Sequence, residues 1–145
     1  MKIKFNKLDS SNLDVIIGLM QKLYEHDHII FDQKIARFTL DYLLKDESKG
    51  KVWLISYNND TAGYCVLTFG YSLEFHGRDA LMDELYISDE FRGKGLGQET
   101  IKFIEGFCKE LKIDAIPILQ LYKSKTITWT STGFIEKAEV VKQLK

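Results

Sequence analysis

One segment in the second half of the chain places three glycines at alternate positions between two apolar runs. The segment, ELYISDEFRGKGLGQETI, covers residues 84–101. The run that ends at Ile87 has the apolar and aromatic residues of a strand, and the positions after the glycines recur at helical spacing. Because glycine has no side chain, successive N–H groups in such a turn can converge on one anion. The segment therefore predicts a strand, an anion-binding turn and a helix, in that order.

The first half of the chain is predicted to form a strand, two helices and a hairpin, and we interpret residues 1–145 as one domain. Residues 3–8 alternate as in a strand, and the polar residues 9–11 offer N-caps for a helix. Asp32 offers the cap of a second helix. The turn residues 58–60 then divide a β-rich stretch into an antiparallel hairpin.

The second half is predicted to hold further strands around the helix that follows the glycines. A polar loop at 74–79 precedes a strand at 80–87. Residues 115–122 are an apolar run typical of a buried strand, and a last strand covers 134–141. Residues 122–134 fit a strand by their period of two, or a short helix, and the pattern does not choose between them. The fold class is α/β or α+β with a mixed sheet.

Each predicted helix has apolar residues at helical spacing that share one face. These faces are Leu13, Ile16, Ile17, Met20, Leu23 and Tyr24 in the first helix, Ile35, Phe38, Tyr42 and Leu43 in the second, and Ile101, Ile104, Phe107, Cys108 and Leu111 in the third.

Composition and charge exclude several classes of protein. Twenty basic and 21 acidic residues give a net charge of -1, which argues against a nucleic-acid partner. No stretch reaches the roughly 18 apolar residues of a membrane span, and the N-terminus lacks the apolar core of a signal peptide. Cys65 and Cys108 lie far apart in apolar surroundings, as reduced thiols do. We therefore expect a cytoplasmic protein without a membrane partner.

Three kinds of glycine turn compete for this segment. A P-loop needs Ser or Thr after Gly-Lys, and here Gly95 follows Lys94. A dinucleotide turn needs the spacing G-x-G-x-x-G after the first strand, and here the spacing is G-x-G-x-G after a late strand. The remaining pattern, Arg92, two residues, Gly95, one residue and Gly97, resembles the acetyl-coenzyme A signature R/Q-x-x-G-x-G/A of the GNAT superfamily of N-acetyltransferases. GYCVLTFG and the later TGF also stand where that family has its third strand and its closing Gly-Phe pair.

The resemblance implies a mostly antiparallel mixed sheet flanked by helices, and acetyl-CoA as the cosubstrate. It implies that the main chain of Leu85, Tyr86 and Ile87 pairs with the pantetheine arm. We interpret Trp129 as an aromatic residue that packs in the core or against the pantetheine. The residues implied to hold the pyrophosphate are Arg92, Gly93, Lys94, Gly95, Leu96, Gly97 and Gln98.

Acetyl transfer to an amine requires a base, because an alkylammonium has a pKa of about 10.4. Glu84, just before the pantetheine-pairing residues, is the first candidate, and Asp83 is the second. The competing interpretation of Glu84 is a solvated carboxylate paired with a lysine. Glu74 and His76 lie just upstream, and convergence of Glu74 with the two candidates would favour a cationic acceptor such as a polyamine, a lysine side chain or an aminoglycoside.

The general acid departs from the family pattern. Many members have a tyrosine four residues before the Gly-Phe pair, and here that position is Trp129. Either Tyr122 or another tyrosine protonates the leaving thiolate, or the thiolate leaves into solvent, since a thiol has a pKa of about 8.5. This departure keeps open a non-catalytic acyl-CoA-binding regulator. A nucleotide-binding or phosphate-binding interaction domain is the alternative from another class.

Other reactive side chains are not assigned to the site. His26 and His28 are interpreted as a solvated helix end and not as metal ligands, since no cysteine pair lies nearby. His26 and Asp27 are expected to border the acceptor groove. Neither cysteine has an adjacent histidine, so we expect direct transfer rather than an acetyl-cysteine intermediate. Exposed sheet edges make a homodimer an open expectation.

Overall fold

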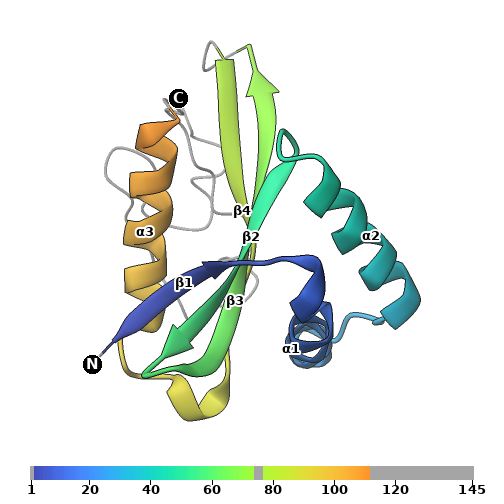
Figure 1. The fold of residues 1–145 in the computed structure, drawn as a ribbon, viewed down its shortest axis with the longest axis vertical. Helices are drawn as coiled ribbons and strands as arrows, with labels where there is room; N and C mark the ends of the chain where they lie inside the picture. Colours follow the sequence, from blue (N-terminus) through green and yellow to red (C-terminus); the bar gives the residue numbers. More distant parts are fainter. Residues whose placement is uncertain (1, 74–76, 112–145) are drawn as a thin grey trace.

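The computed structural model describes residues 2–73 and 77–111 (Figure 1). The elements predicted after residue 111, and with them Tyr122 and Trp129, lie outside the described residues, as do Glu74 and His76. The described elements are β1 (Ile3–Lys7), the 3-10 helix η1 (Ser10–Asn12), α1 (Leu13–His26), α2 (Gln33–Lys45), β2 (Gly50–Tyr57), β3 (Asp60–Ser72), β4 (Gly77–Ile87), the 3-10 helix η2 (Asp89–Phe91) and α3 (Leu96–Glu110).

The four strands form one antiparallel sheet in the order β1-β2-β3-β4. The predicted hairpin is confirmed, because β2 and β3 pair across a turn at Asn58 and Asn59. Both residues have positive φ values, 49° and 74°. A two-residue turn with two positive φ values matches the twist of the flanking strands, and asparagine tolerates this conformation.

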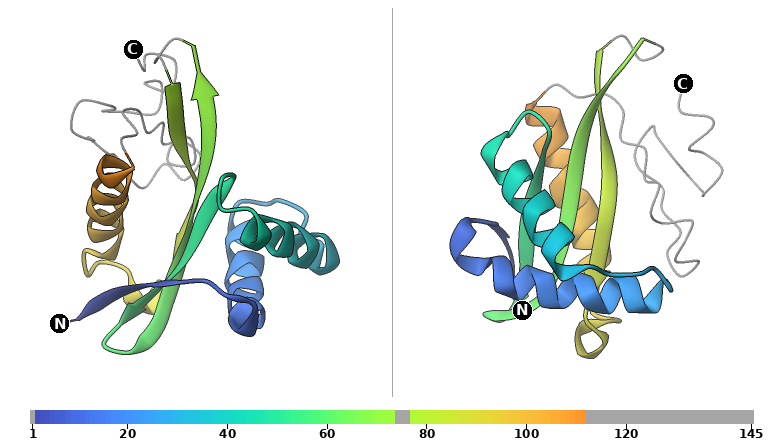
Figure 2. Two further views of the ribbon diagram at one scale, coloured as in Figure 1. Left: turned by 45° about the horizontal axis from the view of Figure 1, so that its top comes forward. Right: turned by 90° about the vertical axis from the view of Figure 1, so that its right-hand side faces the viewer.

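The helices cover the two faces of the sheet unequally. The ribbon views place α3 on one face and α1 with α2 on the other (Figures 1 and 2). The α3 side buries side chains such as Ile55, Leu67 and Ile104. The opposite side buries Ile16 and Tyr64 with their neighbours. The sheet is therefore the middle of three layers.

A β-bulge in β4 changes which face its side chains reach. Val66 of β3 pairs with Glu84, and Leu67 pairs with Met82, so Asp83 is an extra residue in β4. Before the bulge, Met82 belongs to the core under α3. After it, Glu84 lies opposite Val66, whose side chain is in the core under α1 and α2. The bulge thus turns Glu84 toward the α1 side.

The apolar face predicted from the sequence of α2 is largely exposed. Ile35, Phe38 and Tyr42 are 64%, 73% and 57% exposed. The helix instead buries Ala36 and Leu40, with Leu43 and Leu44 partly buried beside them. Two apolar stripes at helical spacing run along α2, and periodicity alone does not select the one that meets the sheet.

Candidate active site at the end of strand β4

The glycine turn after β4 has the backbone conformation that the sequence predicts. Gly93 and Gly95 have φ values of 75° and 84°, in the left-handed region that disfavours residues with a Cβ. Gly95 is the N-cap of α3 and provides no side-chain cap. Within the described residues, the N–H groups of residues 96–98 meet no acceptor, since the first bond of the helix runs from Glu99 to Gly95. The turn therefore presents main-chain donors at the positive end of a helix dipole.

Two cations flank this turn and differ in their partners. The Nε of Arg92 donates a 2.8 Å hydrogen bond to the carbonyl oxygen of Ile87. Its guanidinium also pairs with Asp89 at 3.2 Å and lies 5.6 Å from the ring centre of Tyr86. Lys94 extends the other way, with its Nζ 5.9 Å from the ring centre of Tyr57. Arg92 thus ties the turn back to the end of β4.

Strand β4 is at one end of the strand order among the described residues. The carbonyl of Tyr86 is directed at β3, only 2.0 Å from where a Cβ on Gly63 would lie. The N–H of Ser88 also donates to β3, at the carbonyl oxygen of Ala62 (2.8 Å). Since main-chain groups alternate along a strand, those of Leu85 and Ile87 point away from β3. Of the three residues predicted to pair with pantetheine, Tyr86 therefore has its main-chain groups directed at β3, whereas those of Leu85 and Ile87 are not.

Glu84 is buried, with 8% of its surface exposed. Its Oε2 accepts a 2.6 Å hydrogen bond from the hydroxyl of Tyr24 on α1, and its Oε1 accepts one of the same length from the hydroxyl of Tyr64 on β3. No lysine or arginine of the described residues pairs with it. The interpretation of Glu84 as a solvated carboxylate paired with lysine was wrong.

The surroundings of Glu84 favour its protonated form. Burial raises the pKa of this carboxyl, and the charges of Asp83 and Asp27 raise it further. The hydrogen bonds from Tyr24 and Tyr64 act in the opposite direction without cancelling the effect. The charges of Asp83 and of Asp27, at the end of α1, therefore both act on Glu84.

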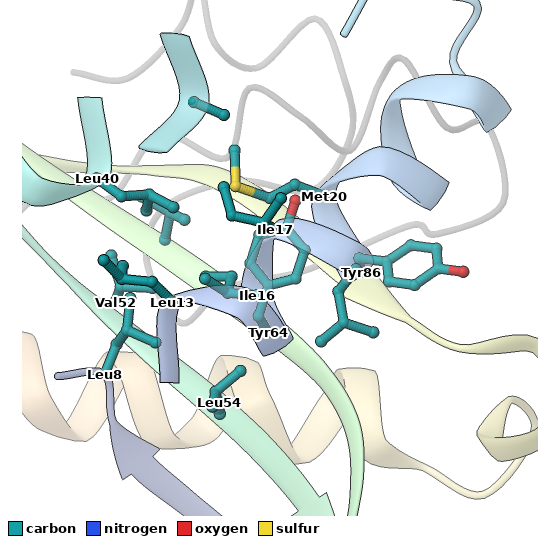
Figure 3. Packing of buried hydrophobic residues seen from close by; sticks show 13 residues of the cluster. Leu8, Leu13, Ile16, Ile17, Met20, Leu40, Val52, Leu54, Tyr64 and Tyr86 are labelled. Atoms are coloured by element: carbon teal, nitrogen blue, oxygen red, sulfur yellow. The ribbon is translucent and has the colours of Figure 1, made fainter. Parts of the chain in front are cut away.

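Tyr64 is completely buried under α1, next to Ile16 and Ile17 (Figure 3). The side chain of Tyr86, also buried, points away from Tyr64 and Ile16 (Figure 3). Tyr64 was not predicted from the sequence as a site residue, and Tyr24 was predicted only as part of an apolar helix face. No local pattern marks either tyrosine as a partner of Glu84, because they lie 20 and 60 residues away.

A cleft of about 460 Å³ opens between the last turns of α1 and the end of β4. His26 borders this cleft, whereas Asp27, the other residue expected to border the acceptor groove, is not among its described lining residues. The other residues lining it are Lys22 and Glu25 of α1, and Tyr86, Ser88, Asp89, Glu90 and Arg92 beyond it. The cleft therefore brings charged residues of both signs next to the glycine turn.

The two cysteines are buried and free. Burial raises the pKa of Cys65 far above that of a free thiol and the pKa of Cys108 to about 12, so both stay as unreactive thiols. Across residues 2–73 and 77–111, no three His, Cys, Asp or Glu side chains are placed to hold a metal. No helix in this part of the chain has the length and apolarity needed to cross a bilayer.

The fold is shared with solved structures of low sequence identity. A Cole Harbour Salt Marsh integron cassette protein superposes with a TM-score of 0.76 at 24% identity, over 88% of this chain and 84% of its own. A GNAT family acetyltransferase of Staphylococcus aureus gives 0.70 at 20% identity, over 90% and 96%. A predicted acetyltransferase with acetyl-CoA from Clostridium acetobutylicum gives 0.70 at 15% identity, over 90% and 92%. These likenesses establish the fold.

A search of curated proteins returns no significant relative by sequence. The family comparison is decisive, because the model of the acetyltransferase (GNAT) family matches residues 18–128, well over half of the chain. The matched range includes the glycine turn, β4 and most of α1. The chain therefore belongs to the GNAT family of acetyltransferases.

Proposed function

We propose that the protein is an N-acetyltransferase that transfers the acetyl group of acetyl-CoA to a primary amine of a small molecule or peptide, by direct attack in a ternary complex. The observation that carries this proposal is the N-terminus of α3, which has no side-chain cap among the described residues and follows the turn at Gly93 and Gly95. This turn comes directly after β4, a strand that pairs on one side only within residues 2–73 and 77–111. This turn can hold two linked phosphates, and the strand beside it can pair with an amide-containing arm.

The residues of the turn have separate roles in this proposal. The N–H groups of residues 93–98 bind the pyrophosphate, and Arg92 and Lys94 add full positive charges. Leu85 and Ile87 offer main-chain groups to the pantetheine arm, in place of the three consecutive residues expected from sequence. Trp129 stays a prediction for the packing around that arm.

Glu84 is the proposed general base. An ammonium group of pKa about 10.4 must lose a proton before it attacks the thioester, and a base with a raised pKa holds that proton better than an ordinary carboxylate does. The buried setting of Glu84 and the nearby charges of Asp83 and Asp27 supply such a raised pKa. Asp83 is assigned to this electrostatic role, and Tyr122 stays the predicted acid for the leaving thiolate.

The acceptor is proposed to be a cationic amine. The charges of Asp83 and Asp27 both act on Glu84, and acidic groups of this kind attract an approaching cation. Spermidine, a lysine-containing peptide and kanamycin represent the three acceptor classes considered above. Assay of free-thiol release from acetyl-CoA with each amine tests the proposal, and E84Q should lower turnover while leaving acetyl-CoA affinity nearly unchanged.

The two alternatives give different results in binding and turnover experiments. A non-catalytic regulator binds acetyl-CoA and releases no thiol with any amine of the panel formed by spermidine, the lysine-containing peptide and kanamycin. A nucleotide-binding domain is stabilised against heat by ATP and not by CoA, whereas the proposed enzyme shows the opposite preference. Stabilisation by ATP alone would contradict the proposal. Homodimerisation and a cytoplasmic location stay predictions.

A further inference from the structure

The proposed base has little direct access to solvent or substrate. Glu84 is 8% exposed, and each of its carboxylate oxygens already accepts a hydrogen bond from a phenol. A proton that arrives at this carboxylate has its shortest route through one of these two hydroxyl groups. The two hydroxyl groups differ in how much of their residue is exposed.

Tyr64 has no exposed surface and lies in the core beneath α1. Tyr24 is only partly buried, on the turn of α1 next to Glu25 and His26, two residues that line the cleft. Its hydroxyl is 2.6 Å from Oε2 of Glu84, and its ring packs edge to face on Phe31 at 5.2 Å. Of the two described hydrogen-bonding partners of Glu84, Tyr24 is therefore the one with exposed surface, although it is not among the residues that line the cleft.

We infer that Tyr24 carries the proton from the acceptor amine to Glu84, an inference that rests on the proposed function. An N–H bond of the ammonium group breaks as its proton binds the hydroxyl oxygen of Tyr24. The proton of that hydroxyl moves at the same time to Oε2 of Glu84. The amine is then neutral, Tyr24 is again a phenol and Glu84 is a carboxylic acid, so that atoms and charges balance.

The electrostatic setting suits a relay better than a tyrosinate base. Burial and the neighbouring Glu84 raise the pKa of Tyr24 above that of a free phenol, with a smaller effect from Asp83. Tyr24 thus stays protonated at neutral pH and passes a proton only as it receives one. The other titratable groups acting on Glu84 are Tyr64 of β3, the neighbouring Asp83, and Asp27 beyond α1. Of these three, only Tyr64 is described as donating a hydrogen bond to Glu84, and it has no exposed surface.

Two variants that each remove one hydroxyl from Glu84 test the relay. Both Y24F and Y64F delete a hydrogen bond that lowers the pKa of Glu84, so both should shift the acidic limb of the pH profile of kcat to higher pH. Only Y24F breaks the relay. We expect it to lower the plateau rate above that limb by about 100-fold, and at least tenfold more than Y64F does. Tyr42→Phe, an exposed tyrosine of α2, is the control for the loss of a hydroxyl at the surface.

The assay uses the full chain, acetyl-CoA and the amine of the panel that gives the fastest thiol release. Unfolding temperatures are measured for every variant, and 3-fluorotyrosine at position 24 provides a second variant that keeps the hydroxyl. This residue should restore a plateau that Y24F loses. A Y24F plateau equal to wild type, or an equal loss in Y64F, overturns the relay while the loss of turnover in E84Q still supports Glu84 as base. Absence of turnover in the wild-type protein overturns both proposals.

Discussion

The Nε of Arg92 donates a 2.8 Å hydrogen bond to the carbonyl oxygen of Ile87, so that the turn before α3 is held against the last residue of β4. The same guanidinium pairs with Asp89 at 3.2 Å. One side chain thus links the proposed pyrophosphate loop to the strand that is proposed to pair with pantetheine. The fixed position of this cation leads to a first prediction.

Arg92→Ala should weaken acetyl-CoA binding about 10- to 100-fold. The variant loses a charged hydrogen-bond donor to the phosphates, and it also loses the side chain that keeps the loop ordered. Isothermal titration calorimetry measures the affinity. Lys102→Ala is the matched control, because Lys102 is an exposed cation further along α3 whose partner is Glu99 at 3.6 Å. Equal losses in the two variants would contradict a specific role for Arg92.

Two glycines of the same helix should respond oppositely to alanine. Gly95→Ala should lower the free energy of unfolding by about 1 kcal/mol, because its φ of 84° is unfavourable for a residue with a Cβ. Gly106→Ala should raise it by about 0.5 to 1 kcal/mol, since this exposed position is helical and a Cβ there meets nothing within 4 Å. Urea denaturation measures both, and a stabilising Gly95→Ala contradicts the assigned turn.

His28, two residues after the end of α1, has a strained conformation that glycine should relieve. Its φ is 57°, its N–H donates to the carbonyl of Glu25, and the N–H of Ile29 donates to the carbonyl of Tyr24. These bonds form a helix C-terminal motif in which glycine is preferred at the left-handed position. His28→Gly should raise the free energy of unfolding by about 1 kcal/mol, and His28→Val should lower it. Thermal and urea unfolding both measure these changes.

The raised pKa of Glu84 has a consequence for the pH dependence of stability. Because the folded protein holds this proton more tightly than the unfolded chain, the contribution of Glu84 to stability is complete below the unfolded pKa and is lost as pH rises through the folded one. The stability of E84Q relative to wild type should therefore increase between about pH 4 and pH 7. Urea denaturation at the two values measures the difference.

Glu47 provides a control of opposite sign. This exposed carboxylate pairs with Lys7 and Lys51, and hydrogen bonds from these lysines lower its pKa to about 2. The contribution of Glu47 to stability is present above the pKa that this group has in the unfolded chain. It is lost as the pH falls toward the pKa of Glu47 in the folded protein. Relative to wild type, Glu47→Gln should therefore lose stability on going from acid to neutral pH. A shared trend in the Glu84 and Glu47 variants would contradict the assigned environments.

The two apolar stripes of α2 should differ in their effect on stability. Leu40 is 4% exposed, and Leu40→Ala should lower the free energy of unfolding by about 2 to 5 kcal/mol. Phe38 is 73% exposed, and Phe38→Ser should change it by at most about 0.5 kcal/mol. Urea denaturation measures both changes, and a large loss in Phe38→Ser would show that this stripe is covered in solution.

Local rules were sufficient for much of the fold. The paired asparagines predicted the β2–β3 hairpin, and the glycines predicted the turn that opens α3. The sequence could not show which of two chemically similar faces of a helix is buried. Both stripes of α2 are apolar, so the sequence did not reveal that Ala36 and Leu40 are the buried pair.

The candidate site, too, was predictable where it depends on local sequence and not where it depends on contacts between distant segments. Glu84 stood out through its place before the glycine turn, and its proximity to Asp83 required no folding information. Tyr24 and Tyr64 reach Glu84 only after the sheet and α1 have assembled, so their roles depend on contacts between distant segments. The alternating orientation of strand residues gave no sign of an insertion within β4.

Because Asp83 is inserted in β4, the position of Glu84 along the pleat, and not only its identity, determines which side of the sheet its carboxylate occupies. Deletion of Asp83 would restore uninterrupted pairing with β3 and leave Met82 and Glu84 on opposite faces, because adjacent residues of a regular strand point to opposite sides of the sheet. A family member that kept a residue at this point as part of a regular ladder would instead place the equivalents of Met82 and Glu84 on one face. With an intact glycine turn, it would keep the phosphate-binding loop while directing its carboxylate into a different layer of the molecule.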